Sequence, residues 1–199
     1  MSETIADWKQ IWSQAPAAGI ALAMWRLPNQ SQQFLIQDSQ GGIRVDVGEL
    51  EQLGSGFLVG PFIGQPYFLQ AGEIKQKSMT ECPVGSAFYE QNISNDILKQ
   101  TFQTQVAESI QQIKAGHFQK VVLSRLDEKA LSEDFDLLDA FDRLCQTYAT
   151  AFVSAVYLPD LQSVWLCATP ETLVSQDASG IFRTISLAGT QSGLDAAGH

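Results

Sequence analysis

The chain has 199 residues, of which 45% are apolar and 17% are charged, a composition typical of a globular protein and not of a disordered or fibrous one. Its 12 Lys and Arg against 22 Asp and Glu give a formal net charge of −10. Such an acidic surface repels phosphate, which argues against partners that are nucleic acids or anionic membranes. The sequence contains no long apolar run that predicts a membrane-spanning helix or a secretory signal, so we expect a cytoplasmic protein.

The first half of the chain predicts mostly short strands. A helix is expected at residues 5–14, because Ile5, Trp8, Ile11 and Trp12 recur at helical spacing before Ala15-Pro16 stops it. Apolar runs separated by Gly, Pro and Asn then predict a hairpin and two further strands, followed by a connecting segment. The predicted ranges are 19–27 and 33–37 for the hairpin, 54–62 and 67–74 for the strands, and 75–94 for the connection.

The second half predicts two helices, at 96–115 and 134–148, because apolar residues recur there at three- and four-residue steps. The β-branched run at 118–126 predicts a strand between them. Short turns predict an antiparallel meander after the second helix. Helices combined with antiparallel strands define an α+β fold, in which we expect both helices to pack on one largely antiparallel sheet. The four strands of the meander are expected at 151–158, 163–168, 172–176 and 181–187.

The three cysteines are scattered along the chain and form no CxxC pair, which argues against a zinc site or a disulfide framework. A reducing compartment with three buried free thiols is the expected state. The residues concerned are Cys82, Cys145 and Cys167.

Lys120 lies inside the predicted strand, next to Val121, Val122 and Leu123. A lysine held against apolar neighbours is partly desolvated, which would make it a base near neutral pH. The local sequence also fits a lysine at a strand end whose ammonium group reaches solvent. Both interpretations stay open on these residues alone.

Two further features follow at strand ends. Pro170 forces an irregular step before Glu171, so this carboxylate would sit on a fixed corner and could act as an acid, or could be an exposed turn residue. Gly189 stands between Ala188 and Thr190, where backbone N–H groups could approach a carboxylate, although an ordinary glycine turn fits as well.

Taken together, three motifs in this order and spacing resemble those of the chorismate-utilising enzymes, which include isochorismate, salicylate, anthranilate and aminodeoxychorismate synthases. The resemblance covers residues 94–190, whereas residues 1–93 are similar to the divergent β-rich N-terminal region of that family without a motif of their own. It implies two parts, 1–93 and 94–199, the second being the first part of an incomplete chorismate-binding domain. The motifs are FQKVVLSR at 118–125, WLCATPE at 165–171 and FRTISLAGT at 182–190.

The resemblance also implies roles for the candidate residues. Lys120 would be the base that activates water, and Glu171 the acid that assists departure of the ring hydroxyl group of chorismate. Ala188, Gly189 and Thr190 would form a substrate-binding turn. Members of the family that add ammonia usually have Gln in place of Lys120, and aminodeoxychorismate synthases commonly have Lys in place of Ala188. The resemblance therefore favours the water-adding isochorismate synthase branch.

Magnesium is the cofactor that the resemblance implies, because Mg²⁺ would neutralise a carboxylate of the substrate in a protein of net charge −10. The family's metal-binding glutamates and its carboxylate-binding Arg and Lys come after the Gly-Thr turn, and the sequence ends at His199. We therefore expect no metal ligand in this chain, and a fragment that is inactive by itself.

Several alternatives stay open. The chain could belong to a salicylate synthase or to an anthranilate-type synthase in which Lys120 is coincidental. It could also be a catalytically inactive binding or structural module. The sequence leaves open whether the pathway serves menaquinone or siderophore synthesis, and it leaves the oligomeric state open.

Overall fold

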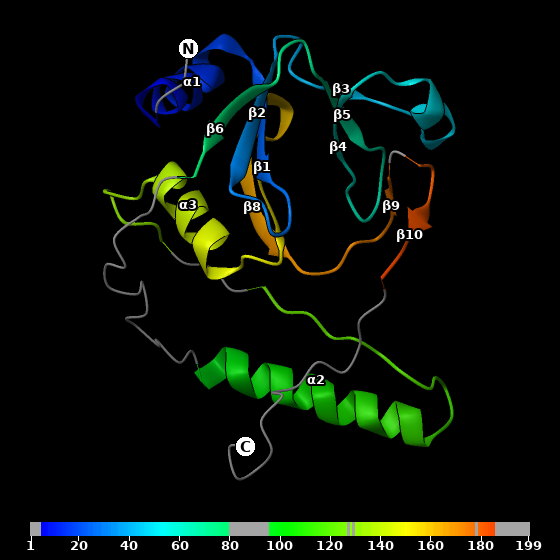
Figure 1. Ribbon diagram of the computed structural model, residues 1–199. Helices are drawn as coiled ribbons and strands as arrows, with labels where there is room; N and C mark the ends of the chain where they lie inside the picture. Colours follow the sequence, from blue (N-terminus) through cyan, green and yellow to red (C-terminus); the bar gives the residue numbers. More distant parts are fainter. Residues whose placement is uncertain (1–4, 80–95, 127, 129, 178, 186–199) are drawn as a thin grey trace. The chain divides into compact units, whose positions relative to one another are not determined.

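The fold is mixed α and β with antiparallel sheets, as predicted (Figure 1). A computed structural model describes residues 5–79, 96–126, 128, 130–177 and 179–185. The chain divides into two compact units. Unit 1 comprises Met1–Cys82 and Asp136–His199, and unit 2, Pro83–Phe135, is inserted between them. The predicted boundary between residues 93 and 94 lies outside the described residues.

Unit 1 is organised around a five-stranded antiparallel sheet in the order β6-β2-β1-β7-β8. Its centre is the predicted hairpin, which is confirmed: Ala21 pairs with Asp38 and Arg26 with Gln33. Asn29 turns the chain between the two strands with a φ of 60°, a conformation that Asn tolerates. The strands are β1 (Ala21–Arg26), β2 (Gln32–Asp38), β6 (Lys75–Ser78), β7 (Phe152–Leu158) and β8 (Ser163–Thr169).

One face of this sheet is covered by helices α1 (Ile5–Ala18) and α3 (Leu137–Thr147). Side chains alternate across a strand, so Met24, Leu35 and Val153 point to this face together. They pack against Trp8 of α1 and Phe141 of α3, which are 0% and 1% exposed. We call this the helix-covered face.

Helix α3 is fixed at both of its ends. Asp136 caps its N-terminus by accepting hydrogen bonds from the backbone N–H groups of Leu138 and Asp139, at 2.9 and 3.1 Å. At the other end the buried Arg26 guanidinium donates hydrogen bonds of 2.7 and 3.1 Å to the carbonyls of Tyr148 and Cys145. It therefore satisfies carbonyls that have no partner within the helix.

The opposite face of the sheet packs against a second, three-stranded sheet in the order β3-β5-β4. Ala23 and Ile36 of the large sheet meet Tyr67 and Leu69 of β5. Strand β4 begins at Gly56. A Cβ atom at this position would lie 2.3 Å from the Phe68 ring, so only glycine fits there. The strands are β3 (Ile43–Arg44), β4 (Gly56–Val59) and β5 (Tyr67–Gln70), with the short 3₁₀ helix η1 (Val47–Gln52) between β3 and β4.

Helix α1 extends beyond its predicted end. The prediction that Ala15-Pro16 stops it is wrong, since the helix continues through Pro16 to Ala18. It ends at Gly19, whose φ of 66° suits glycine, and the N–H of Ile20 bonds back to the Ala15 carbonyl at 3.1 Å.

Two other expectations need correction. Residues 75–78 form β6 and not part of a connecting segment, because Lys75 to Ser78 pair with β2. The strands after α3 do not form one sheet, since only β7 and β8 join the large sheet. Strands β9 (Ser175–Gln176) and β10 (Phe182–Arg183) pair separately, because the irregular step at Pro170 ends the ladder of β8. The helical turn η2 (Pro159–Leu161) connects β7 to β8.

Unit 2 contains helix α2 (Asp96–Lys114), which confirms the second predicted helix. Gly116 follows it with a φ of 79° and ends it as expected. Because α2 belongs to unit 2, its predicted packing on the sheet of unit 1 stays a prediction. None of the helices in the described part of the chain is both long and apolar enough to cross a membrane.

Candidate functional site

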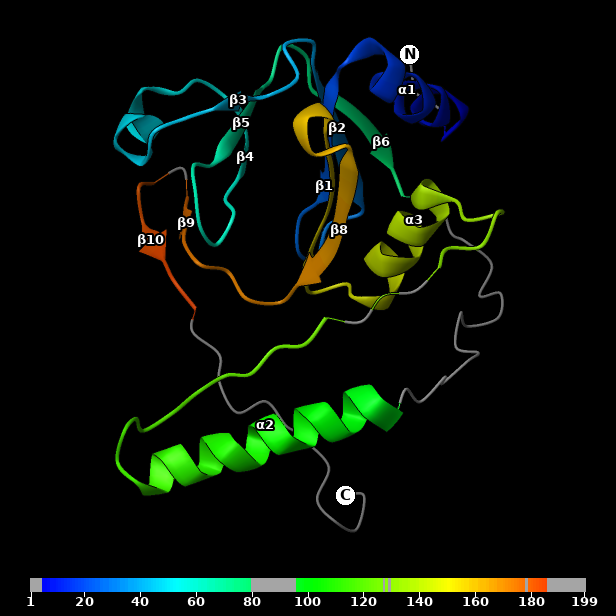
Figure 2. The same cartoon turned by 180° about the vertical axis from the view of Figure 1, so that it is seen from behind.

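The edge strand β8 carries an exposed surface on the face opposite the helices. Residues of β8 alternate, and Trp165 and Cys167 lie opposite Val156 and Ser154 of β7. The three-stranded sheet covers β1 and β2 but leaves β8 uncovered, so Trp165 is 62% exposed and Cys167 is also exposed. We call the surface of Trp165, Cys167 and Thr169 the open face; Figure 2 shows β8 along the near edge of the sheet.

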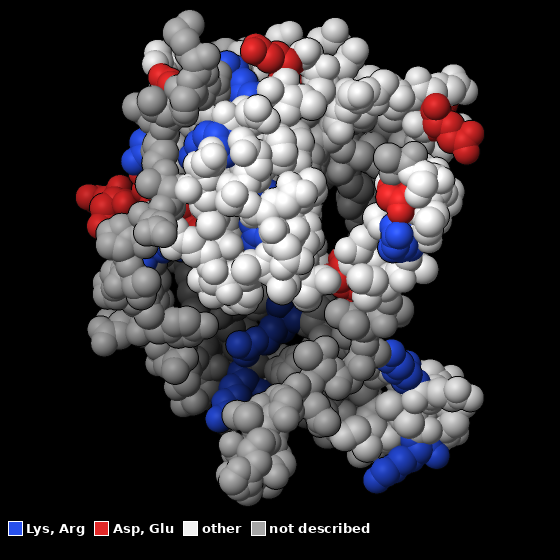
Figure 3. Space-filling view, in the orientation of Figure 1, with Lys and Arg blue, Asp and Glu red and all other residues white. Residues whose placement is uncertain are grey.

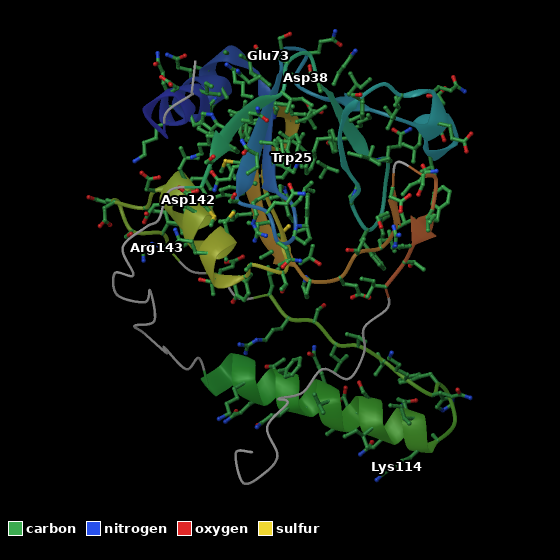
Figure 4. The ribbon with its side chains drawn as sticks, viewed as in Figure 1. Trp25, Asp38, Glu73, Lys114, Asp142 and Arg143 are labelled. Carbon is green, nitrogen blue, oxygen red and sulfur yellow. The ribbon has the colours of Figure 1, made fainter. Side chains whose placement is uncertain are left out.

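Four half-buried aromatic rings border the open face. Trp25 stacks on Phe34 with ring centroids 5.5 Å apart and tilts against Phe57 of β4 at 5.3 Å. Phe57 also stacks on Phe152, which lies directly opposite Thr169 in the ladder. Figure 4 labels Trp25 on β1, between the two sheets. The rings join the two sheets and give this side of unit 1 an apolar floor.

Glu171 lies at the end of the open face, two residues after β8. The Thr169 hydroxyl group holds this corner, because it lies 3.3 Å from both the backbone N and the carbonyl O of Glu171. The carboxylate is exposed. The corner predicted after Pro170 is therefore present, and Glu171 is exposed there, as one of the two interpretations of this residue predicted.

The chain after Glu171 returns to the same place through the β9–β10 hairpin. The N–H of Ile185 donates to the Thr172 carbonyl at 3.0 Å, and the Thr184 hydroxyl donates to the Leu173 carbonyl at 2.6 Å. These bonds bring residue 185 beside the residue that follows Glu171. The hairpin thus places Ile185, the last described residue, beside Thr172, which follows Glu171. Ala188, Gly189 and Thr190 themselves lie outside the described residues.

Asp177 holds the turn of this hairpin. Its carboxylate accepts hydrogen bonds from the Ser179 hydroxyl at 2.6 Å and from the N–H of Ile181 at 3.1 Å, and it pairs with Arg183 at 2.6 Å. The Ser179 hydroxyl, the Arg183 guanidinium and the Ile181 N–H together lower the pKa of Asp177 to about 2. The turn predicted around Asp177 and Gly180 is confirmed, with Ala178 outside the described residues.

Lys120 belongs to unit 2 and Glu171 to unit 1, so the prediction that they act together as base and acid on one substrate stays a prediction. The strand predicted at 118–126 is wrong, because the described chain is irregular throughout this range. A β-branched run forms a strand only against a hydrogen-bonded neighbour, and 118–126 takes part in no ladder of the described structure. Lys120 and Val122 are exposed, so of the two interpretations of Lys120 the structure agrees with the lysine that reaches solvent.

The cysteines follow the prediction in part. Cys145 of α3 is a buried free thiol, and burial is the main cause that raises its pKa. Cys167 is free but exposed, so its predicted burial is wrong, because it faces outward from an edge strand that no other layer covers. Cys82 lies outside the described residues.

Charge is sparse around the open face. Figure 3 shows the side of unit 1 that lies away from β8, where uncharged residues cover much of the visible surface. Between residues 163 and 185 the sequence contains one cation, Arg183, and this residue is paired with Asp177. An anionic ligand at the open face would therefore need a cation from another part of the protein.

The described residues do not form a magnesium site. No group of three or more His, Cys, Asp or Glu side chains capable of holding a metal ion occurs among them. The predicted Mg²⁺ thus has no ligand set in the described part of the chain.

Sequence reasoning missed the role of Thr169 and the stacked rings of the open face. The alternation in SVWLCAT, followed by Pro, gave a signal that Trp165, Cys167 and Thr169 share one face. Nothing in the sequence showed that the three-stranded sheet would leave this face uncovered, because that depends on which strands the sheet packs against.

Comparison with known families matches this set of features to a class of enzymes that act on chorismate. The family model described as "chorismate binding enzyme" matches residues 69–196, which is more than half of the chain and includes every candidate residue. The chain belongs to the chorismate-binding enzyme family. No curated protein and no solved structure matches the chain.

Proposed function

We propose that this protein acts as an isochorismate synthase, which converts chorismate to isochorismate by adding water and releasing hydroxide. The observation that carries the proposal is Lys120 within FQKVVLSR, inside the range that the family model matches. The resemblance places Lys in water-adding members at this position, whereas Gln is usual in members that add ammonia. Membership of the family supports chorismate as the small-molecule substrate.

The proposed roles conserve atoms and charge. Lys120 as the neutral amine takes a proton from water, and the resulting oxygen forms a bond to one carbon of the ring. The double bonds of the ring shift, and the C–O bond to the ring hydroxyl group breaks. Glu171 in its acid form gives a proton to that leaving oxygen, which departs as water. One water enters and one leaves, so the product is an isomer of chorismate.

The geometry around Glu171 supports this assignment. Its corner is held by the Thr169 hydroxyl group and its carboxylate is exposed, so a bound substrate could reach it. Ile185, four residues before Gly189 in the sequence, bonds to Thr172 beside this corner, which supports a contribution of Gly189 and Thr190 to the same site. We propose that these residues and Ala188 form the substrate-binding turn.

The charges near the open face support binding of the substrate carboxylates by a cation other than Arg183. Chorismate carries two carboxylates, and Arg183 near the open face is paired with Asp177. A requirement for Mg²⁺ remains part of the proposal, without ligands assigned to it.

Product identification tests the proposal. The full-length gene product that contains this chain would be incubated with chorismate and Mg²⁺, with and without ammonium, and the products would be separated by chromatography. We expect isochorismate as the main product under both conditions, and no product after chelation of divalent ions. Salicylate with pyruvate would assign the salicylate synthase branch instead. Anthranilate or an aminated chorismate formed with ammonium would overturn the proposed use of water.

A matched substitution sharpens the same test. Lys120→Gln keeps a polar side chain of similar length but cannot take a proton, so isochorismate formation should fall about 10²–10⁴-fold. Chorismate binding, measured by calorimetry, should persist. A Lys120→Gln variant that still forms isochorismate at the normal rate would show that another group is the base.

A further inference from the structure

Unit 2 leaves unit 1 just after strand β6 and returns to it just before helix α3. The segment that carries Lys120 is therefore held at both ends by elements of unit 1. An interaction that holds β6 and α3 together therefore also holds the two ends of the inserted unit 2. Buried polar side chains of α3, β2 and β6 gather on the helix-covered face, where the charge of Lys77 on β6 acts on Asp142 of α3.

Asp142 of α3, Gln33 of β2 and Lys77 of β6 form this cluster, and they are 4%, 0% and 6% exposed. Gln33 donates a hydrogen bond of 2.6 Å from its amide nitrogen to the Asp142 carboxylate. Gln33 and Lys77 are directly paired neighbours in the β2–β6 ladder, so their side chains leave the sheet on the same face. The Lys77 ammonium also lies 4.5 Å from the centre of the Trp8 ring of α1.

The surroundings of Asp142 are electrically mixed. Burial raises the pKa of Asp142, whereas the Gln33 hydrogen bond and the charge of Lys77 lower it, and the carboxylates of Asp139 and Asp136 raise it further. Three other charged contacts surround α3. Lys9 of α1 pairs with Asp136 at 2.5 Å, and Arg143 pairs with Asp139 at 3.0 Å. The Arg26 guanidinium donates to the Cys145 carbonyl at the end of the helix.

In the described part of unit 1, this cluster connects α3 to β2 by the Gln33–Asp142 hydrogen bond and to β6 by the charge of Lys77. The Lys9–Asp136 pair is exposed and joins α3 to α1, and such pairs stabilise weakly. Arg26 fixes the far end of α3 to β1. Breaking a buried pair by removing one partner is costly, because the other charge is left without compensation. Loss of Lys77 or Asp142 should thus weaken the join between β6 and α3 selectively.

We propose that Gln33, Lys77 and Asp142 form a latch that holds together the two points at which unit 2 joins unit 1. The latch is a positioning device and does not touch substrate. It keeps β6 and α3 in register at the base of the insertion, and its strength depends on the charge of its two ionisable members. The inference concerns unit 1 alone and does not rest on the proposed activity.

Amide hydrogen exchange on the full chain tests the latch. Lys77→Met removes the ammonium and keeps an unbranched side chain, so an uncompensated carboxylate remains in the core. We expect amides of β6 and α3 to exchange about tenfold faster or more. Asp139→Asn is the control on the same helix, since Asp139 is half-exposed and pairs with Arg143. In this variant the exchange rates of the β6 and α3 amides should change by less than about twofold.

The double variant Lys77→Met/Asp142→Asn separates a latch from general packing. Asn at position 142 can still accept the hydrogen bond from Gln33 but carries no charge. The double variant should therefore exchange more slowly than Lys77→Met alone, and Lys77→Arg, which keeps the cation, should stay closer to the natural protein. Additive effects of the two substitutions would overturn the proposal, as would a Lys77→Met variant that behaves like Asp139→Asn.

The natural protein supplies a test that needs no destabilised variant. Because the pKa of Asp142 is raised in the folded protein, its neutral form contributes stability that is present below the unfolded carboxyl value of about 3.9. This stability is lost as pH rises through the folded pKa. After correction for intrinsic exchange rates, β6 and α3 should open more often as pH rises, and less so in Asp142→Asn. Equal pH profiles for these two proteins would contradict the latch.

Discussion

The two faces of the five-stranded sheet differ in how completely they are covered. On the helix-covered face, Trp8 and Phe141 are almost fully buried, and polar groups such as Arg26 and Asp142 find partners inside the core. On the other face the three-stranded sheet stops short of β8, so that Trp165 stays 62% exposed. Both faces bury a hydrophobic core, and on the first face that core extends to Leu166 and Ala168 of β8. The second leaves apolar surface and an exposed carboxylate available to a ligand.

The difference indicates where substitutions should act. Changes on the helix-covered face should reduce the free energy of unfolding, because they remove buried area or leave polar groups without partners. Changes around the open face, and at Lys120, should reduce turnover while leaving the fold intact.

Lys120→Ala should have the largest effect on activity. Loss of a general base costs about 10²–10⁴-fold in rate, so isochorismate formation by the full-length protein should nearly disappear while the melting temperature stays the same. Lys114→Ala is the control, because Lys114 is also an exposed lysine of unit 2, at the end of α2 (Figure 4). Steady-state kinetics of both variants would make the measurement. Similar rates for the two would remove Lys120 from the reaction.

Glu171→Gln should lower turnover by about 10²-fold or more, since an amide cannot supply the proton that the leaving hydroxyl group needs. Stability should not change, because Glu171 is exposed. Glu49→Gln, a change at another exposed carboxylate of unit 1, serves as the control and should leave the rate unaltered. A Glu171→Gln variant that loses stability as well as activity would point to a structural role for this residue.

Phe141→Ala against Trp165→Ala compares the two faces directly. Phe141 is 1% exposed, so its truncation leaves a cavity and should cost about 3–5 kcal/mol of unfolding free energy. Trp165 is 62% exposed, so the same truncation should cost less than about 1 kcal/mol. Urea denaturation of both variants measures the difference. Equal losses would mean that the open face is covered in the protein.

Gly56→Ala tests the packing of the three-stranded sheet that borders the open face. A methyl group there would meet the Phe68 ring at 2.3 Å and the Leu69 carbonyl oxygen at 2.4 Å, so we expect a loss of about 1–3 kcal/mol. Gly60→Ala is the control, because no atom lies within 4 Å of its added carbon. Thermal denaturation would distinguish them, and an unchanged Gly56→Ala variant would mean that β4 can move away from β5.

The smallest effect concerns the β9–β10 hairpin. Because hydrogen bonds and Arg183 lower the pKa of Asp177 to about 2, its ionised form stabilises the turn above the usual carboxyl value, and that contribution is lost as pH falls through about 2. Carboxyl NMR should show Asp177 titrating near this value, with the Ile181 amide losing protection at the same pH. Titration of Asp177 near the ordinary carboxyl value would show that the turn is open in solution.

Much of the fold could be predicted from local sequence. The β1–β2 hairpin, α2, α3 and the β7–β8 pair all have periodic apolar patterns bounded by turn residues or caps. Local apolar patterns did not predict strand formation correctly where a strand depends on a pairing partner that is distant in the sequence. Residues 118–126 read as a strand but find no ladder among the described residues, and the polar run at 75–78 became a strand because β2 offered an edge.

The candidate site was predictable in composition but not in arrangement. The motifs identified Lys120 and Glu171, and the family match includes both. Their burial was not predictable, because it depends on which layers pack beside them, and both side chains are exposed. The hydroxyl group of Thr169, which fixes the Glu171 corner, becomes visible only through its two contacts in the folded chain.

The proposed isochorismate synthase activity depends most on water being the nucleophile that this protein adds to chorismate. Incubating the full-length gene product with chorismate in ¹⁸O-labelled water, and analysing the product by mass spectrometry, tests this claim directly. If water is the nucleophile, the isochorismate formed should carry one oxygen from the solvent, and its rate of formation should fall sharply in Lys120→Ala. An isochorismate without label, or an aminated product in the presence of ammonium, would contradict it.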